Sequence, residues 1–332
     1  MMGKEIPATM KAVEITEPGG AEALRAGSRP TPQAGPGEVL VKVAFAGING
    51  PDLMQRRGLY PPPKGASDLL GLEISGEVVA TGDGVSRWSV GDRLCALTNG
   101  GGYAEYCAVN ADHCLPIPEG LDLAEAASLP ESYFTIWSNI FMTAGLSAGE
   151  IFLVHGGAGG LGTTSIQLGK AFGATVVATD SPADRCAFCE SLGADRVIDY
   201  ADEDFVDVVR ETFGGADVIL DIVGGPYIAR NIKAAKPDAR IVQLAFALGA
   251  DVQINLMPVM LKRLHYTGST LRSRPDAYKA LVARNLEEKV WPLFGEGKLK
   301  PVVNTILPLA DAAEAHSLME SAGHRGKIIL SC

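Results

Sequence analysis

A glycine-rich segment near the middle of the chain has the residue types and spacing of a nucleotide-binding turn. It directly follows the apolar run 151–155, precedes a stretch with helical periodicity, and reads Gly157-Ala158-Gly159-Gly160-Leu161-Gly162. In a G-x-G-x-x-G turn, the first glycine permits the tight turn, the second admits a pyrophosphate group, and the third allows close packing of helix and strand. Amides at the helix N-terminus then bind the pyrophosphate. The segment therefore predicts a dinucleotide site.

An acidic residue follows at the distance that such a site requires. Asp180 ends the next apolar run, Val176 to Thr179, within roughly 20 residues of the glycine turn. Its carboxylate there can bind the adenosine ribose hydroxyls. Because a serine and a proline follow it, Asp180 also has the position of a helix N-cap, and the two roles are compatible. We predict that Asp180 binds the cofactor.

Two other reactive groups have weaker contexts. His155 ends the first apolar run, where we expect it to pack beneath the glycine turn rather than to act as an acid or base. Cys186 and Cys189 have C-x-x-C spacing, but they lie in a predicted helix without a second cysteine pair. We expect these thiols to have neither a redox role nor a metal role.

The elements that must position these residues form an alternating pattern. Six predicted strands alternate with helical stretches, at Ile151–His155, Thr175–Thr179, Arg196–Ile198, Val218–Asp221, Arg240–Leu244 and His265–Gly268. This alternation is typical of a doubly wound parallel α/β sheet, the Rossmann fold. Short strands between turns dominate the first third of the chain, and the last segment adds helical patterns at 278–294 and 310–321 and a strand at 327–331. We predict a Rossmann domain at 129–271, inserted into a β-rich domain formed by 1–128 and 272–332.

The composition limits the class of partner. The 332 residues carry a formal charge of −10, from 39 acidic and 29 basic residues that form no blocks, which argues against nucleic acid and anionic membranes. Neither a signal peptide nor an apolar run of roughly 18–20 residues is present. Six cysteines in a chain of this length fit reduced thiols better than a disulfide scaffold. We expect a cytoplasmic protein that acts on a small molecule.

Ordered motifs along nearly the whole chain carry a family resemblance. They are Gly47-Ile48-Asn49-Gly50-Pro51-Asp52, Arg57-Gly58-Leu59-Tyr60-Pro61-Pro62-Pro63, Gly71-Leu72-Glu73-Ile74-Ser75-Gly76, Val90-Gly91-Asp92-Arg93-Leu94, Gly102-Tyr103-Ala104-Glu105-Tyr106, the glycine turn and Gly326-Lys327-Ile328-Ile329-Leu330. With them, the chain resembles the zinc-free quinone oxidoreductases of the medium-chain dehydrogenase/reductase family, in the branch related to the p53-inducible quinone oxidoreductase. The resemblance implies a GroES-like fold for the β-rich domain and a homodimer, in which the apolar region 264–270 at the sheet edge would be covered.

The positions that hold zinc in the metal-dependent relatives are changed. Asn49 stands where those relatives carry a cysteine, and Leu72 stands where they carry a histidine. Their compact run of four cysteines is also missing, since Cys95, Cys107 and Cys114 do not have its spacing. We therefore expect no zinc.

Without a metal ion, a carbonyl group must be polarised by hydrogen-bond donors. Asn49 and Tyr60 are the candidates, and the resemblance implies that both positions face the nicotinamide and the substrate. A turn role for Asn49 and a loop-packing role for Tyr60 stay open as alternatives. The resemblance also implies cofactor contacts at Thr135, Val223, Gly224, Ala245 and Phe246.

The residues and the resemblance point to different dinucleotides. Relatives in the quinone oxidoreductase branch usually prefer NADPH, and the basic residue and the tyrosine that they carry after the second strand correspond to Arg185 and Tyr200. Asp180 instead favours NADH, because its charge repels a 2′-phosphate. Arg185 and Ser181 could still hold the phosphate if Asp180 turned away to cap the helix. We favour NADH over NADPH.

The resemblance implies an enzyme that transfers hydride from NADH or NADPH to a quinone or another conjugated carbonyl compound. Reduction of the double bond of an enone or enoyl thioester is an alternative, because it uses the same donors. A dinucleotide-binding protein with little turnover is a second alternative, because fold does not fix function.

Overall fold

The computed structural model describes residues 6–321 and 323–332, and these divide into two compact units. The first unit contains the described residues up to Phe134 together with those from Arg272 to Cys332, and the second runs from Thr135 to Leu271. Helix α3 (Pro130–Ile136) carries the chain from the first unit into the second. None of the helices among the described residues is both long and apolar enough to span a membrane.

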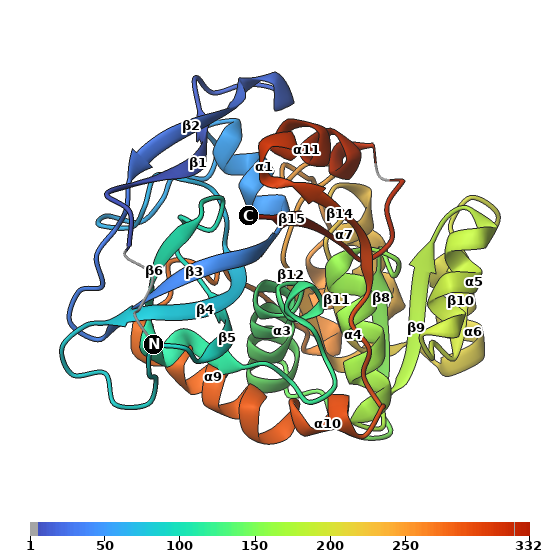
Figure 1. Ribbon diagram of the computed structural model, residues 1–332. Coiled ribbons are helices and arrows are strands. Elements are labelled where there is room, and N and C mark those ends of the chain that lie inside the picture. Colours follow the sequence, from blue (N-terminus) through green and yellow to red (C-terminus); the bar gives the residue numbers. More distant parts are fainter. Residues whose placement is uncertain (1–5, 322) are drawn as a thin grey trace. The chain divides into compact units, whose positions relative to one another are not determined.

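The second unit is built on a six-stranded parallel sheet (Figure 1). Its strands lie in the order β10-β9-β8-β11-β12-β13, which is the 3-2-1-4-5-6 order of the doubly wound dinucleotide fold. Their bounds are β8 Ile151–His155, β9 Thr175–Asp180, β10 Arg196–Asp199, β11 Ala216–Asp221, β12 Ala235–Gln243 and β13 His265–Gly268. The predicted α/β Rossmann class is confirmed.

Helices pack against this sheet and build its core. They are η3 (Trp137–Thr143, a π-helix), α4 (Gly160–Ala171), α5 (Ala183–Ser191), α6 (Phe205–Phe213), α7 (Pro226–Ala234) and α8 (Met257–Lys262). One core cluster joins Leu153, Val177 and Ile219 of the central strands to Phe205 of α6 and Ile232 of α7. Strands that are apolar on both faces explain why the sequence shows continuous apolar runs here.

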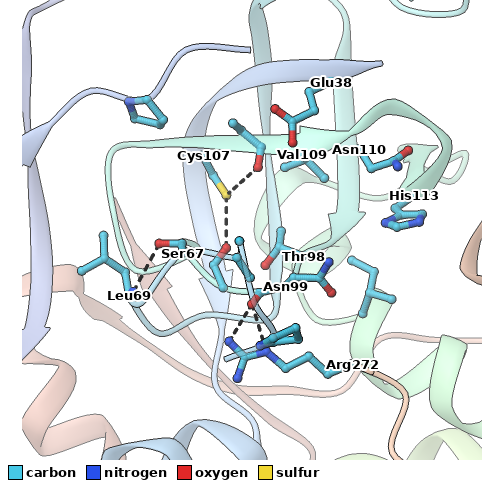
Figure 2. Close-up of a pocket in the computed structure, with 18 of the residues that line it drawn as sticks. Glu38, Ser67, Leu69, Thr98, Asn99, Cys107, Val109, Asn110, His113 and Arg272 are labelled. Carbon is cyan, nitrogen blue, oxygen red and sulfur yellow. Dashed lines mark hydrogen bonds between the residues drawn. The ribbon is translucent and has the colours of Figure 1, made fainter. Parts of the chain in front are cut away.

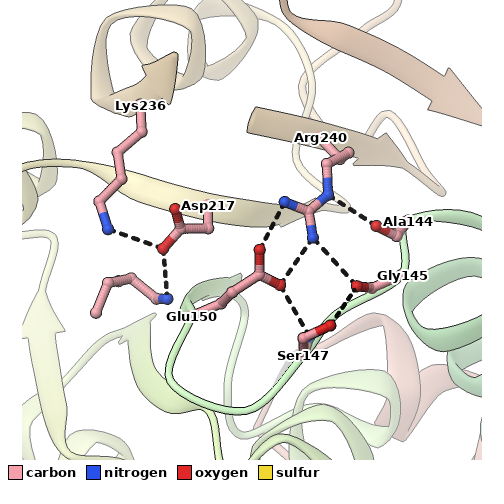
Figure 3. A network of polar contacts seen from close by, with 8 residues as sticks. Ala144, Gly145, Ser147, Glu150, Asp217, Lys236 and Arg240 are labelled. Atoms are coloured by element: carbon pink, nitrogen blue, oxygen red, sulfur yellow. Dashed lines mark hydrogen bonds and ion pairs between the residues drawn. The ribbon is translucent and has the colours of Figure 1, made fainter. Parts of the chain in front are cut away.

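Ion pairs and hydrogen bonds join three neighbouring strands of the sheet near the N-terminal ends of β8 and β11 (Figure 3). Glu150 receives two guanidinium hydrogen bonds from Arg240, both at 2.8 Å, and Arg240 also donates to the carbonyl oxygen of Ala144 at 2.7 Å. Asp217 accepts from Lys236 at 2.8 Å and from the backbone amide of Ile151 at 2.7 Å. These contacts join β8, β11 and β12, so that the opposite ends of the same strands are held in register.

The first unit contains two antiparallel-rich sheets (Figure 1). Strands β1 (Thr9–Ile15) and β2 (Leu24–Pro30) form a two-stranded sheet. The larger sheet has seven strands in the order β14-β15-β3-β4-β5-β7, with β6 paired to β3. Their bounds are β3 Glu38–Gly47, β4 Glu73–Thr81, β5 Arg93–Leu97, β6 Tyr106–Asn110, β7 Cys114–Pro116, β14 Val303–Pro308 and β15 Lys327–Ser331. Because β15 pairs with β3, the end of the chain completes the sheet that its beginning starts.

Eight helices, most of them short, complete the first unit among the described residues. They are η1 (Ala21–Ala23), α1 (Gly50–Arg56), η2 (Ala111–His113), α2 (Leu123–Ala126), α9 (Asp276–Lys289), α10 (Pro292–Gly295), η4 (Leu309–Asp311) and α11 (Ala312–Glu320). The core of this unit brings Val41, Ile74 and Leu94 of the large sheet together with Leu330 of the last strand. The predicted β-rich character of this part is confirmed.

Candidate functional site

The glycine turn joins β8 to α4 in the second unit. Helix α4 begins at Gly160, with Gly159 as its N-cap. The amides of its first turn therefore have no helical partners and are available to an anion. A Cβ atom built on Gly159 would meet only the carbonyl oxygen of Gly156, at 3.5 Å, so the protein itself leaves space beside this residue. This space and these amides fit a pyrophosphate.

The other glycines of the turn are required by the protein itself. A Cβ on Gly162 would lie 2.1 Å from the carbonyl oxygen of Gly156, and a Cβ on Gly157 would lie 2.8 Å from the Sγ atom of Cys189. The residue of the turn with a positive φ, +72°, is Gly156. The sequence interpretation assigned the tight turn to Gly157. That assignment was wrong, because Gly157 serves close packing.

Asp180 lies at the centre of a polar cluster at the end of β9. Its carboxylate accepts from the amide of Ala158 at 2.7 Å and from the amide of Ser181 at 2.8 Å, and it pairs with the Nε atom of Arg185 at 2.6 Å. The N-cap of α5 is Pro182, and no side chain caps that helix, so the suggested capping role of Asp180 is wrong. Tyr200 is near enough that the charge of Asp180 helps raise the pKa of its phenol, although burial is the larger cause. The predicted residues Asp180, Ser181, Arg185 and Tyr200 thus lie together.

The residues after β11 and β12 for which the resemblance implies cofactor contacts form a second cluster in the same unit. The amides of Val223 and Gly224 donate to Asp221 at 2.7 and 2.9 Å, which fixes the first loop. Gly224 has φ +68°, and a Cβ there would lie 2.8 Å from the Cδ1 atom of Phe246. The carbonyl oxygen of Ala245 accepts from Gln243 at 2.5 Å. The fold therefore brings these two loops together, and their role as cofactor contacts stays a prediction.

Thr135 lies where α3 passes into the π-helix η3. Its carbonyl oxygen accepts from the side chains of Ser138 at 3.2 Å and Asn139 at 2.9 Å, and Asn139 in turn accepts from Ser269 at 2.8 Å. π-Helical turns occur frequently at functional sites.

His155 is buried beneath the glycine turn and makes two internal hydrogen bonds. Its Nε2 atom is 2.8 Å from the Oδ1 atom of Asn231, which can only accept, and its Nδ1 atom is 2.9 Å from the hydroxyl of Thr179. Nε2 therefore carries a proton, and the Thr179 hydroxyl can donate to an unprotonated Nδ1, so both contacts are compatible with a neutral imidazole. Burial lowers its pKa, which favours the same state. This packing arrangement is the one that the sequence favoured over an acid or base role.

In the first unit, Asn49 is the N-cap of α1, and its side chain belongs to a buried charged cluster. The amide oxygen accepts from the ammonium group of Lys327, and the amide nitrogen donates to Glu73 at 3.0 Å. Lys327 and Glu73 also pair directly at 2.5 Å. Both polar atoms of the Asn49 side chain thus have partners within the protein, and its role toward the substrate stays a prediction.

Asp52 fixes the loop that carries Asn49. Its carboxylate accepts from the amides of Asn49 at 2.9 Å and Gly71 at 3.0 Å. Burial raises the pKa of Asp52 to about 6, against the lowering effect of these amides. The hydroxyl of buried Tyr103 faces the same carboxylate and lies 3.0 Å from the Nε2 atom of His316. A chain of polar contacts thus connects α11 with the Asn49 loop.

Tyr60 is half-buried in the loop after α1, and no hydrogen bond of its hydroxyl is found among the described residues. The guanidinium group of Arg272 lies 5.6 Å from the centre of its ring. Burial and the nearby Glu131 raise the pKa of the phenol, whereas the charge of Arg272 lowers it. The phenol is therefore protonated at neutral pH and has a donor available for another molecule.

Sequence reasoning missed Glu73, Lys327, Glu131 and Arg272. Glu131 begins α3, and its backbone amide donates to Glu73 at 2.8 Å. Burial raises the pKa of the Glu131 carboxyl to about 8, and the charge of Glu73 adds to the effect. One signal was present in the sequence, because Glu73 and Lys327 each stand at the start of an apolar strand, where a charged side chain needs a partner.

No group of three or more His, Cys, Asp or Glu side chains within 6–321 and 323–332 is arranged to hold a metal ion. Cys186 and Cys189 lie in α5, where burial raises the pKa of their thiols to about 11 and about 12. At neutral pH both are thiols rather than reactive thiolates.

Comparison with known proteins agrees with this architecture. Residues 35–119 match the model of the alcohol dehydrogenase GroES-like domain, and residues 160–288 match the model named zinc-binding dehydrogenase. Quinone oxidoreductase from Rattus norvegicus is 31% identical over 329 residues, which cover 97% of each chain.

Solved structures with the same fold differ in their stated cofactors. Escherichia coli quinone oxidoreductase complexed with NADPH superimposes with a TM-score of 0.87 at 28% identity, over 97% of this chain and 100% of that one. A structure described as an NAD-dependent alcohol dehydrogenase gives a TM-score of 0.86 at 31% identity, over the same shares. The similarity therefore extends over nearly the whole chain, and the descriptions of both structures name a nicotinamide cofactor.

The glycine turn, the changed zinc positions and this full-length similarity lead to one conclusion. The chain belongs to the zinc-free quinone oxidoreductase family of the medium-chain dehydrogenases/reductases and is an NAD(P)H-dependent oxidoreductase.

Proposed function

We propose that this oxidoreductase reduces a quinone or another conjugated carbonyl compound, with Tyr60 as the hydrogen-bond donor to the carbonyl oxygen. The nicotinamide ring supplies the hydride when the cofactor is bound. The observation that carries the proposal is the half-buried phenol of Tyr60, which has no hydrogen-bond partner among the described residues and lies beside the cation Arg272. The names of the relatives support the substrate class.

Tyr60 stabilises the negative charge that develops on the oxygen as hydride is delivered. Because its pKa is raised, the phenol keeps its proton at neutral pH and donates it to that oxygen. The positive charge of Arg272 stabilises the phenolate that remains. Hydrogen-bond donors and cations take over the polarising function that a metal ion has in other members of the family.

Asn49 acts as a second polar group whose orientation is fixed by its neighbours. The ammonium group of Lys327 holds its amide oxygen, and Glu73 holds one of its N–H groups. The second N–H group has only a weak, 3.5 Å contact with the carbonyl oxygen of Gly47. A substrate oxygen would replace this contact and accept a hydrogen bond from that N–H group.

We propose NADH as the preferred cofactor. Asp180 is the last residue of β9, and its carboxylate accepts from the amide of Ala158. Its ion pair with Arg185 already uses the cation that a 2′-phosphate would need. A ribose hydroxyl can donate to the carboxylate, whereas a phosphate would be repelled by it.

We also propose that the protein is a homodimer. Strand β13 is an edge of the six-stranded sheet, and its Tyr266 is 43% exposed. Exposed apolar side chains precede it on α8, where Met257, Met260 and Leu261 are each at least 60% exposed. A second copy that pairs with this edge would cover both features.

A Tyr60→Phe variant tests the catalytic proposal. We expect kcat to fall about a hundredfold or more, because one oxyanion donor is worth about 2.7–4 kcal/mol. The dissociation constant of the dinucleotide should change little. The matched control is Tyr278→Phe, since Tyr278 lies on α9 against Arg274 and should leave both quantities unchanged. An unchanged kcat in Tyr60→Phe would remove Tyr60 from the mechanism.

A further inference from the structure

The first unit contains a cavity of about 700 Å³ that neither Asn49 nor Tyr60 lines. Its wall includes Ser67, Asn99, His113, Arg272 and Lys279, which come from four separate stretches of the chain (Figure 2). The volume lies within the range of small-molecule sites in proteins, roughly 300–1,000 Å³. The proposed reaction assigns no role to this cavity.

Two buried cations lie in the wall of the cavity. Arg272 is 6% exposed and Lys279 is 1% exposed. Arg272 donates to the carbonyl oxygen of Asn99 from Nε at 2.9 Å and from Nη2 at 2.6 Å, and to the side-chain oxygen of Gln55 at 2.7 Å. Lys279 donates to the side-chain oxygen of Asn99 at 2.7 Å and to the carbonyl oxygen of Arg272 at 2.8 Å. All of these acceptors are neutral.

No carboxylate of the described residues lies within 4.0 Å of either cation. Burial lowers the pKa of Arg272 and of Lys279, while the charges of Asp52 and Glu131 near Arg272, and of Asp276 and Glu131 near Lys279, act in the opposite direction. A guanidinium group has five N–H groups and an ammonium group has three. The contacts above therefore leave two donors of Arg272 and one of Lys279 for another acceptor.

Three acidic side chains line the cavity, and none of them forms an ion pair with Arg272 or Lys279. Asp68 pairs with Arg29 at 2.9 Å, and Asp276 lies 3.8 Å from the Nε2 atom of His113. Glu38 accepts from the amide of Gly35 at 2.9 Å. Asp276 is near enough that its charge acts to raise the pKa of Lys279, but the described residues of the wall give neither cation a direct ion-pair partner.

The backbone of the wall is shaped to approach Arg272 closely. Gly100 has φ +134°, and a Cβ there would lie 2.7 Å from the carbonyl oxygen of Ser67 and 3.1 Å from the Nη2 atom of Arg272. Only glycine fits this conformation and this space. The loop thereby presents both oxygens of Asn99 to the two cations and holds them at the cavity wall.

We propose that this cavity binds a small anionic molecule whose carboxylate or phosphate group is held by Arg272 and Lys279. Such a group pairs directly with the two cations and accepts their remaining N–H groups.

Isothermal titration calorimetry on the cofactor-free protein tests the site independently of the reaction. Inorganic phosphate and succinate are titrated separately, with ionic strength held constant by chloride. We expect at least one of them to bind saturably, and the stronger one identifies the preferred group. Lys279→Gln should weaken that binding about tenfold or more, because a charge-assisted hydrogen bond is lost. Lys289→Gln removes the same charge from an exposed position on the same helix and should not change it.

A second variant keeps the test decisive if Lys279→Gln does not fold. Ser67 lies at the surface of the cavity, close to Gly100 and Gly101. Ser67→Asp places a carboxylate in the cavity and should abolish anion binding, whereas Ser67→Asn should retain it. If neither anion binds the wild-type protein, or if Ser67→Asp and Ser67→Asn bind equally well, the proposal is overturned. Because no hydride transfer is measured, these outcomes are independent of the catalytic role of Tyr60.

Discussion

At the scale of single residues, the ammonium group of Lys327 pairs with both Asn49 and Glu73. The family resemblance implies that Asn49 stands where zinc-dependent relatives carry a cysteine. The ammonium group of the lysine is positively charged, but it cannot coordinate a substrate oxygen as a metal ion does. It stabilises the buried carboxylate of Glu73 instead, and the donor to the substrate must come from another side chain. Tyr60 has the required properties.

The buried carboxyl of Glu131 gives a prediction about stability and pH. Burial raises its pKa from 4.5 to about 8, so the unfolded chain releases this proton at lower pH than the folded protein does. The contribution of Glu131 to the free energy of unfolding is therefore fully present below pH 4.5 and is lost as the pH rises to about 8. We expect Glu131→Gln to flatten the fall in stability across this interval, as measured by urea denaturation at a series of pH values. Parallel curves for wild type and variant would contradict the assignment.

Asp180 gives a prediction about cofactor choice. Removing its carboxylate in Asp180→Ala releases Arg185 from the ion pair and removes the charge that repels a 2′-phosphate. We expect the ratio of kcat/KM for NADH to that for NADPH to fall about tenfold or more. Asp202→Ala, which removes an exposed carboxylate beyond β10, serves as the control. A wild-type enzyme that prefers NADPH and is indifferent to Asp180→Ala would refute the NADH proposal.

At the scale of elements, local patterns in the sequence predicted most of the strands of the second unit. The predicted strands at Ile151–His155 and His265–Gly268 agree with the structure at both ends, and the others differ by a few residues. The largest difference is β12, which begins at Ala235 rather than Arg240. Pro237 lies in this stretch, and proline is unusual within a strand because it has no amide hydrogen to donate. Continuous apolar runs are visible in a sequence because every residue of such a strand is buried.

The charged cluster of the first unit was not predictable in the same way. Glu73 lies 24 residues from Asn49, and Lys327 lies 278 residues from it. Their contacts exist only because β15 pairs with β3, and β3 with β4. The pairing of strands so far apart is set by tertiary packing rather than by a local pattern. Arg272 likewise reaches Asn99 and Gln55 only through the return of the chain to its first unit.

The glycine turn allows its two structural roles to be separated. The Cβ of Gly159→Ala would meet nothing closer than 3.5 Å, so the melting temperature should change little while dinucleotide affinity falls. The Cβ of Gly162→Ala would lie 2.1 Å from a carbonyl oxygen, so this variant should be clearly less stable. Thermal melting and dinucleotide titration of both variants measure the two effects. Loss of stability in Gly159→Ala with unchanged affinity would show that the open space does not receive the cofactor.

At the scale of the whole molecule, the segment that forms the second unit, with its complete parallel sheet, lies in the sequence between the two segments that form the first unit. The nucleotide-binding features lie in one unit, and the donors to the substrate lie in the other. Each unit has its own buried core, and each was recognisable from a different property of the sequence. Alternating strands and helices indicated the second unit, whereas short strands and turns indicated the first.

The assembly of the molecule is tested by light scattering. We expect a dimer mass for the wild type, since β13 and the exposed side chains of α8 need a cover. Met260→Glu introduces a charge into that surface and should shift the mass toward the monomer. Leu281→Glu makes the same change at a position on α9 that is 41% exposed, and it should leave the dimer intact. A monomeric wild type at micromolar concentration would contradict the proposal.

The most direct test of the central claim is the steady-state oxidation of NADH and NADPH by the purified protein in the presence of different acceptors. The panel contains quinones, conjugated enals and enoyl thioesters, and the reduced products are identified. We predict turnover with quinones or conjugated carbonyl compounds, with hydride delivered so that the carbonyl oxygen gains the proton. Turnover with enoyl thioesters alone would make the enzyme a double-bond reductase. Tight dinucleotide binding without turnover on any acceptor would contradict the claim that Tyr60 and Asn49 form the donor set of a working reductase.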